Sequence, residues 1–206
     1  MKKVLLTWMV IVAGLSVTAL DINAQNSSAK LRHQQEVQKW HQEMEEFRAR
    51  SEQRREINEL TDSIAGVQAA AAVQTRDFVL EADQVTFKNG NTVFVNSSTT
   101  FISVKGNRAV VQISPSNFAS GPNGVGGVTV DGSISGMQRM VDKRGNTTIS
   151  FNVMGIGINA QIEIYMSPGT NRASATICPN FNSNTIWVEG EIVPYENSDV
   201  FEGMSL

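Results

Sequence analysis

The sequence predicts a mainly β protein, an antiparallel β-barrel preceded by a long charged α-helix, and three observations predict it. An apolar run opens the chain. Seven basic and eight acidic residues then fill the stretch from Lys30 to Asp62, which has no Gly or Pro. From Phe78 to Leu206 the hydrophobic period becomes two, and this part holds 14 of the 16 Gly and all five Pro. A period near 3.6 indicates a helix and a period of two indicates half-buried strands.

Residues 1–24 have the pattern of a secretory signal peptide. Lys2 and Lys3 precede the apolar run, which ends before the small residue Ala24 and a polar QNSS stretch. We expect cleavage after Ala24, and no Cys lies there to carry a lipid. The expected product is a non-lipidated periplasmic or outer-envelope protein without a stable membrane span. An uncleaved anchor is the alternative, because the run of about 17 residues reaches the lower limit for a span.

Residues 25–65 are predicted to form a charged helix. Apolar side chains recur at steps of three and four in two sets, which are Val37, Trp40, Met44 and Phe47, and then Ile57, Leu60, Ile64 and Val67. Ser51 and Arg54 interrupt the stripe, so a sustained heptad coiled coil is not favoured. Two interpretations remain, a solvated helix partly docked on the β domain and a helix that pairs with a partner. Residues 66–77 are predicted to be a linker, with the end of the helix as the alternative for residues 66–73.

Residues 78–206 are predicted to form one antiparallel domain of eight or nine strands. Short turns with Gly-Asn or Asn-Gly pairs separate the alternating runs, as in hairpins. Gly132, Gly136 and Gly190 fall inside strands, where Gly marks a bend, a bulge or a close approach. A sheet that closes into a small barrel needs such bends, so we expect a barrel, with a β-sandwich as the alternative.

The β segment resembles a known family in five stretches. These are VFVNSSTTFISVKGNRAVVQI (93–113), GPNGVGGVTVDGSIS (121–135), VMGIGINAQIEI (153–164), PNFNS (179–183) and VPYENSDVFEG (193–203). They resemble domain of unknown function 4251, a family of secreted proteins from gut Gram-negative anaerobes, over about residues 77–206. The resemblance implies a lipocalin-like β-barrel. It implies no activity, ligand or catalytic residue.

Trp187, Glu189 and Glu191 form the candidate contact surface, because they share one face of a predicted strand. Packing of Trp187 under the helix is the favoured interpretation, and the alternative is an exposed Trp that stacks on sugars or contacts a partner. The two carboxylates are about 7 Å apart along the chain. Such a pair can serve glycoside hydrolysis, and two solvated acids explain it equally well.

Composition disfavours several other chemistries. The formal net charge is −3, and nucleic-acid binders usually carry a basic surface. We expect no cofactor and no metal site, because His33 and His41 both lie in the helix and Cys178 is the one Cys. Cys178 is expected to be a small buried side chain at a strand end. The glycine-rich 121–127 segment is followed by a strand, which disfavours a phosphate loop.

The sequence therefore predicts a non-enzymatic exported envelope protein of unknown biochemical role. The first hypothesis is a binding module that holds a small apolar ligand in the barrel, because small inward residues can leave a cavity. The alternative is a structural or protein-interaction module of the periplasm. A second alternative is a glycan hydrolase that uses Glu189 and Glu191.

Overall fold

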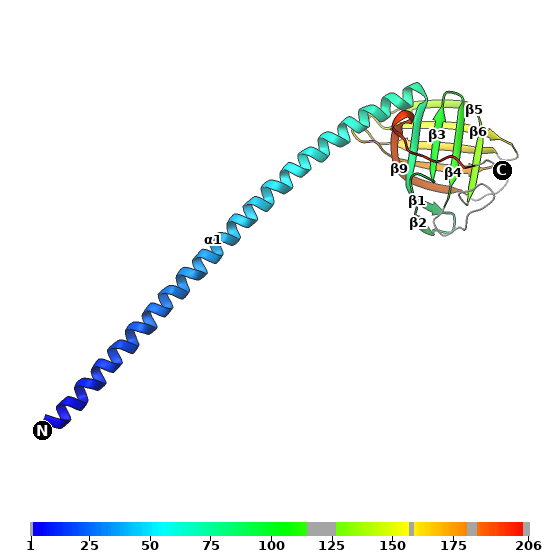
Figure 1. The fold of residues 1–206 in the computed structure, drawn as a ribbon. Coiled ribbons are helices and arrows are strands. Elements are labelled where there is room, and N and C mark those ends of the chain that lie inside the picture. Colours follow the sequence, from blue (N-terminus) through cyan, green and yellow to red (C-terminus); the bar gives the residue numbers. More distant parts are fainter. Residues whose placement is uncertain (1, 115–126, 157–158, 181–184, 204–206) are drawn as a thin grey trace. The chain divides into compact units, whose positions relative to one another are not determined.

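The computed structural model describes residues 2–114, 127–156, 159–180 and 185–203, with side chains from residue 30 onward. The chain divides into two compact units, residues 1–57 and residues 58–206. Figure 1 shows the order of the elements along the chain.

The first unit is helical, as predicted. Helix α1 spans Lys2–Thr75, and its larger part, up to Ile57, makes up this unit. Two ion pairs at i,i+4 spacing, Lys39–Glu43 and Glu46–Arg50, are solvent exposed and add little stability. The predicted apolar stripe is exposed at Trp40 and Phe47. Within the part of the chain whose side chains are described, no helix is both long enough and apolar enough to cross a membrane.

Helix α1 continues through residues 66–73 to Thr75, so the helical-end interpretation of this stretch is confirmed and the linker interpretation is wrong. The run of four Ala residues at 69–72 favours a helix, and packing supports it. Ala69, Ala72 and Val73 are buried and belong to the main hydrophobic cluster of the β domain. Gly66 touches the 169–170 turn so closely that any Cβ would overlap the backbone of Thr170. The end of the helix is thus part of the second unit's core.

In the described part of the chain nine strands follow the helix, one of the two numbers predicted. They are β1 (Asp77–Phe87), β2 (Thr92–Phe94), β3 (Phe101–Lys105), β4 (Arg108–Ile113), β5 (Val128–Val141), β6 (Thr147–Gly155), β7 (Asn159–Met166), β8 (Arg172–Pro179) and β9 (Ile186–Pro194). A short 3-10 helix, η1 (Tyr195–Asn197), follows β9.

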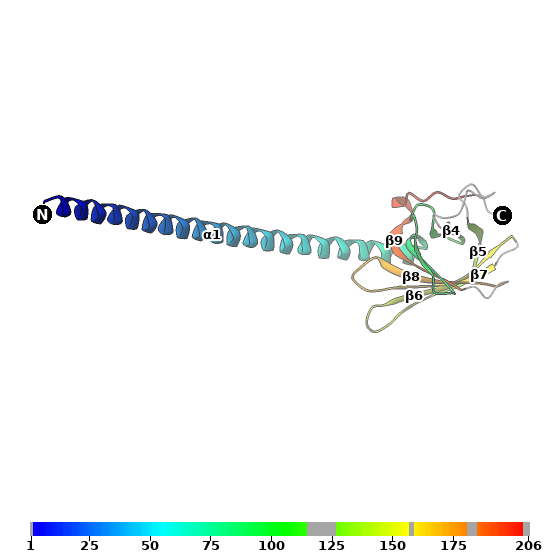
Figure 2. The ribbon, with the colours of Figure 1, turned by 90° about the horizontal axis from the view of Figure 1, so that it is seen from below.

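All strand pairs are antiparallel, and β1 pairs with β9, which closes the sheet into a barrel. The barrel prediction is therefore confirmed and the sandwich alternative is wrong. Strand β2 is an extra strand on β1, beside the segment of β1 that follows its pairing with β3. Figure 2 shows the strands curving around the interior.

Glycine permits this closure at two positions. A Cβ on Gly190 would overlap the carbonyl oxygen of Glu81 on β1, next to a β-bulge between Ala82 and Gln84. Gly136 has a φ of 65° and lies at the register shift between β5 and β6. Bulges of this kind increase local twist and bend a strand, which barrel closure requires.

The barrel interior is the main core. Its largest fully buried side chains come from five strands, and they are Phe78, Leu80, Ile102, Ile149, Phe151, Ile162, Ile164 and Ile192. Alternation places the other side chains of these strands on the outer face, as the pattern predicted for β6 and β7. A second, smaller cluster lies on the outer face around Val79, Phe101 and Val110.

Candidate functional site

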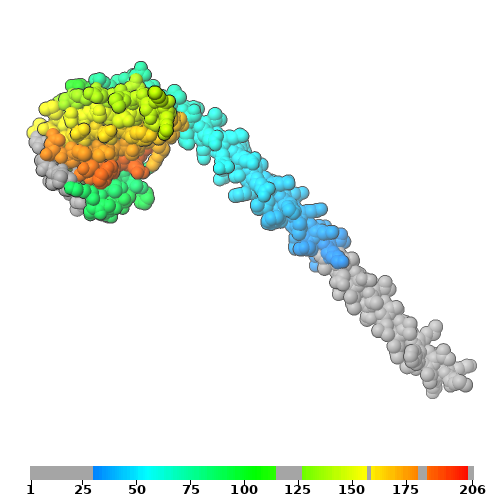
Figure 3. Space-filling view, turned by 180° about the vertical axis from the view of Figure 1, so that it is seen from behind, coloured from blue at the N-terminus to red at the C-terminus, as the bar shows by residue number. Residues whose placement is uncertain are grey.

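The three residues of the predicted contact surface lie on the outer face of β9, as expected from their alternation. Glu189 and Glu191 are exposed, and Trp187 keeps 42% of its surface exposed. Burial of Trp187 under the helix is the interpretation that the sequence favoured, and this exposed fraction does not fit it. Figure 3 shows this side of the barrel, where β6 to β9 (yellow to red-orange) lie side by side at the surface.

Strand register gives these residues their neighbours. Tyr165 on β7 faces Ser174 on β8, which faces Glu189 on β9. In the next row, Thr176 on β8 lies between Glu163 and Trp187. Tyr165 is 43% exposed, so two half-exposed aromatic rings stand on either side of the short hydroxyl side chains of β8.

A groove of about 230 Å³ lies on this face. The residues that line it come from β7, β8, β9 and the turn between β7 and β8, and they are Tyr165, Ser167, Arg172, Ala173, Ser174 and Glu189. The groove therefore combines one aromatic ring, two hydroxyl groups, a guanidinium and a carboxylate. This set can stack on a flat apolar surface and exchange hydrogen bonds with polar groups at its edge.

Arg172 holds the edge of the groove in place. Its Nη1 donates to Oδ2 of Asp83 at 2.5 Å and lies 3.6 Å from Oε1 of Glu191. The hydrogen bond with Asp83 raises the pKa of Arg172, which desolvation opposes, so the guanidinium stays charged. Both pairs are about half exposed, so their contribution to stability is small, and their main effect is to orient the side chains.

The outer face of β1, β3 and β4 is different, because residues 195–203, called here the C-terminal segment, cover it. Val193, Tyr195 and Val200 pack against the outer cluster of Val79, Phe101 and Val110. Ser198 Oγ donates a hydrogen bond to Oε1 of Glu81 at 2.6 Å. Val79, Phe101 and Val110 are thereby removed from water, whereas Phe201 of the segment itself is exposed.

Gln112 attaches the C-terminal segment to β4. Its side chain is completely buried, and its Nε2 donates to the carbonyl oxygens of Thr99 and Phe201, each at 2.9 Å. Its Oε1 accepts from the backbone N–H of Gly203 at 2.8 Å and from Thr129 Oγ1 at 3.0 Å. A buried amide with all of these partners specifies one position of the segment.

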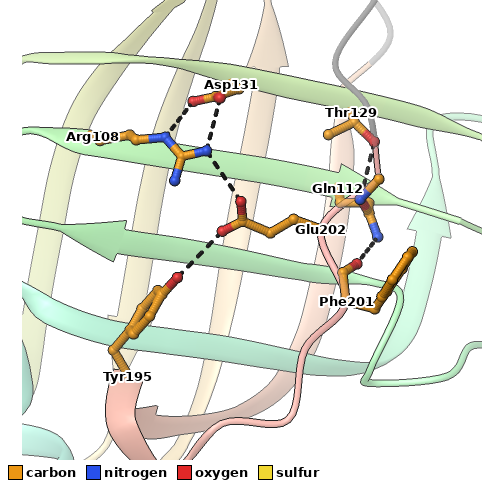
Figure 4. A network of polar contacts seen from close by, with 8 residues as sticks. Arg108, Gln112, Thr129, Asp131, Tyr195, Phe201 and Glu202 are labelled. Atoms are coloured by element: carbon orange, nitrogen blue, oxygen red, sulfur yellow. Dashed lines mark hydrogen bonds and ion pairs between the residues drawn. The ribbon is translucent and has the colours of Figure 1, made fainter. Parts of the chain in front are cut away.

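An ion-pair network continues beside Gln112 (Figure 4). Arg108 donates two hydrogen bonds to Asp131, each at 2.8 Å, and a third to Glu202 at 3.1 Å. The bond with Asp131 raises the pKa of Arg108, against an opposing effect of desolvation. Tyr195 Oη donates to the other oxygen of Glu202 at 3.4 Å, and burial, then the charge of Glu202, raises the pKa of Tyr195. The sequence analysis found none of this network, since Glu202 is 94 residues from Arg108.

Other residues that the sequence analysis discussed lie away from the groove. Cys178 is free and half-buried at the end of β8, with its Sγ 3.8 Å from Thr185 Oγ1, so it is less buried than expected. His33 and His41 are exposed on α1. The proposed glycine-rich loop lies outside the described residues, apart from Gly127. In the described part of the chain, no three His, Cys, Asp or Glu side chains are grouped as metal ligands would be.

The inward positions on which the apolar-ligand hypothesis depended have another structural role. A Cβ on Gly132 would overlap the backbone of Met154, and Gly190 lies where β9 approaches β1. Their cross-strand neighbours are small as well, Ala109 and Gly155 beside Gly132, and Ala82 and Ala173 beside Gly190. Small residues here let the strands approach one another, and an apolar ligand stays a prediction.

Comparison with known proteins identifies relatives but no established role. The model of the family described as domain of unknown function (DUF4251) matches residues 62–192. The crystal structure of a DUF4251 family protein from Bacteroides eggerthii DSM 20697 matches with 46% sequence identity and a TM-score of 0.61. The match covers 69% of this chain and 96% of that one. No curated protein matches significantly.

The matched region includes the end of α1 and extends into β9, and it ends before the C-terminal segment. More than half of the chain lies within it. The chain therefore belongs to the DUF4251 family.

Proposed function

We propose that the protein is an exported, non-enzymatic binding module of the cell envelope. Its ligand binds on the outer face of β7, β8 and β9. The proposal rests on one observation, a contrast between two parts of the barrel's outer face. The C-terminal segment covers the apolar side chains of β1, β3 and β4, whereas Tyr165 and Trp187 remain about half exposed beside a groove.

The positions of the two carboxylates support a binding role over hydrolysis. A glycosidase needs one carboxyl group that keeps its proton through burial and a second that stays ionised. Glu189 and Glu191 both lie on an exposed face, and Glu191 forms an ion pair with Arg172. The surroundings of Glu189 and Glu191 therefore do not assign one carboxyl group to keep its proton and the other to stay ionised.

Native mass spectrometry of the full chain purified from the envelope of its own host tests the proposal. We expect a co-purified species on the wild-type protein that is absent from a Tyr165→Ala/Trp187→Ala variant. A bound species that both proteins carry equally would place the site elsewhere, and an apolar molecule of this kind would favour the barrel interior. A wild-type protein with no bound species, or one bound only to another envelope protein, would contradict the proposal.

The same spectra test export. Intact mass should show a chain that begins at Gln25, because Ala24 is the last small residue before the polar stretch. A chain that keeps residues 1–24 and fractionates with membranes would contradict cleavage.

A further inference from the structure

The two exposed aromatic rings stand at a spacing that suits an extended ligand. Tyr165 and Trp187 belong to strands on either side of β8 and are offset by two residues in register. Neighbouring strands are about 4.8 Å apart and two residues span about 7 Å, so the two Cα atoms are roughly 12 Å apart. The residues between them, Ser174 and Thr176, are short, so the rings rise above a low floor.

Polar groups surround Tyr165, the one of the two rings that lines the groove. Ser167, Ser174 and Glu189 line the groove beside Tyr165, and Arg172 lies at its edge. A pyranose ring has an apolar face that stacks on an aromatic side chain and hydroxyl groups that exchange hydrogen bonds with such neighbours. A purely apolar ligand would leave these polar groups without partners, at a cost in binding free energy.

The charge of this face disfavours negatively charged saccharides. Carboxylates come from Asp83, Glu163, Glu189 and Glu191, while the guanidinium of Arg172 lies beside two of them. The face is therefore negative, and a ligand that carries carboxylate, sulfate or phosphate groups would be repelled. An uncharged ligand meets no such penalty.

We infer that the groove and the two rings on the outer face of β7–β9 bind an uncharged oligosaccharide, with Tyr165 and Trp187 stacking on two positions along it. This inference rests on the proposed binding function and names its ligand class. The shallow groove and the half-exposed rings suit side-on contact with an oligosaccharide. In such contact, further sugar units extend beyond the site at both ends.

Isothermal titration of the full chain tests this inference. The probes are neutral hexasaccharides of glucose, mannose and xylose, with a hexasaccharide of galacturonic acid as the charged comparison. We expect at least one neutral probe to bind and the acidic probe not to bind. Trp187→Ala and Tyr165→Ala should each weaken binding about tenfold or more, a loss of about 1.4 kcal/mol. Trp187→Phe should keep most of the affinity, because it keeps a ring.

Trp40→Ala is the matched control, since it removes an exposed Trp from α1 and should leave binding unchanged. Equal binding by wild type and Trp187→Ala, or tighter binding of the acidic probe, would overturn the inference. Failure of every saccharide would overturn it as well. In that case a species seen by native mass spectrometry that still depends on Trp187 would leave the proposed binding function standing, so the two failures are distinguishable.

Discussion

The outer surface of this barrel is covered by the chain on one half and exposed to solvent on the other. On β1, β3 and β4 the outward side chains include Val79, Phe101 and Val110, and the C-terminal segment buries them. On β7, β8 and β9 the outward side chains include Tyr165 and Trp187, and both remain about half exposed. The barrel thus has a second, smaller hydrophobic cluster on its outer face where the C-terminal segment covers β1, β3 and β4. Elsewhere it presents aromatic rings to solvent, and exposed apolar surface of this kind commonly marks contact sites.

The largest expected effect separates two aromatic residues, one from each half. Phe101→Ala should lower the free energy of unfolding by about 3–5 kcal/mol, because it opens a cavity at a residue that is 1% exposed. Trp187→Ala should lower it by roughly 1–2 kcal/mol, since much of that ring is already in water. Denaturant titration of both variants measures the difference. Equal losses would mean that Trp187 is a core residue and not a contact residue.

A smaller effect is expected at Gln112, which links the C-terminal segment to the barrel. Gln112→Leu should lower the free energy of unfolding by about 3 kcal/mol, because it removes the hydrogen bonds that the buried amide forms with the carbonyls of Thr99 and Phe201 and with the Gly203 N–H. Hydrogen exchange should also accelerate at residues 198–203. Gln161→Leu on exposed β7 is the matched control, with an expected change within about 0.5 kcal/mol. Similar losses for the two variants would show that the segment does not depend on Gln112.

Tyr195, which lies on the covered half of the barrel, makes the stability of the protein depend on pH. Burial and the neighbouring Glu202 raise its pKa above the ordinary value of about 10. Because the folded-state pKa is the higher one, the stabilisation is fully present below the unfolded-state pKa, and it is lost as pH rises through the folded-state pKa. Stability should therefore fall more steeply above about pH 10 in the wild type than in Tyr195→Phe. Identical profiles from denaturant titrations across this range would contradict the burial of the phenol.

The smallest effect is expected on the open half. Replacing Glu189 and Glu191 together by Gln should change the free energy of unfolding by less than about 0.5 kcal/mol per site, because both are exposed and the Arg172 pair is screened by water. A clearly more stable double variant would indicate charges held together at a cost, as active sites often do. The hydrolase hypothesis would then replace the binding proposal.

Much of the fold could be predicted from local patterns. The alternation in β7 assigns Ile162 to the interior and Tyr165 to the surface, and Gly190 signals the close approach that closes the barrel. The burial of the helix end could not be predicted in this way. The Ala run is compatible with a helix, but Ala69 and Val73 are recognised as core residues only when the barrel that buries them is known.

The site was only partly predictable, because register between strands decides it. Alternation alone places Trp187, Glu189 and Glu191 on one face. Their neighbours Tyr165 and Ser174 follow from pairings that one sequence does not contain. The covering of β1, β3 and β4 by the C-terminal segment was even harder to predict from the sequence. It depends on a buried polar residue, Gln112, and on its contacts with residues about 90 positions away.

Thiol accessibility of two matched serines tests the division of the outer face most directly. Ser103 on β3 and Ser174 on β8 both point outward, and the first is 3% exposed whereas the second is exposed. In a Cys178→Ser background, Ser174→Cys should react rapidly with a maleimide, and Ser103→Cys should be protected until the protein is denatured. Equal and rapid labelling of both in the native chain would show that the C-terminal segment leaves the β3 face open, and the contrast on which the binding proposal rests would be lost.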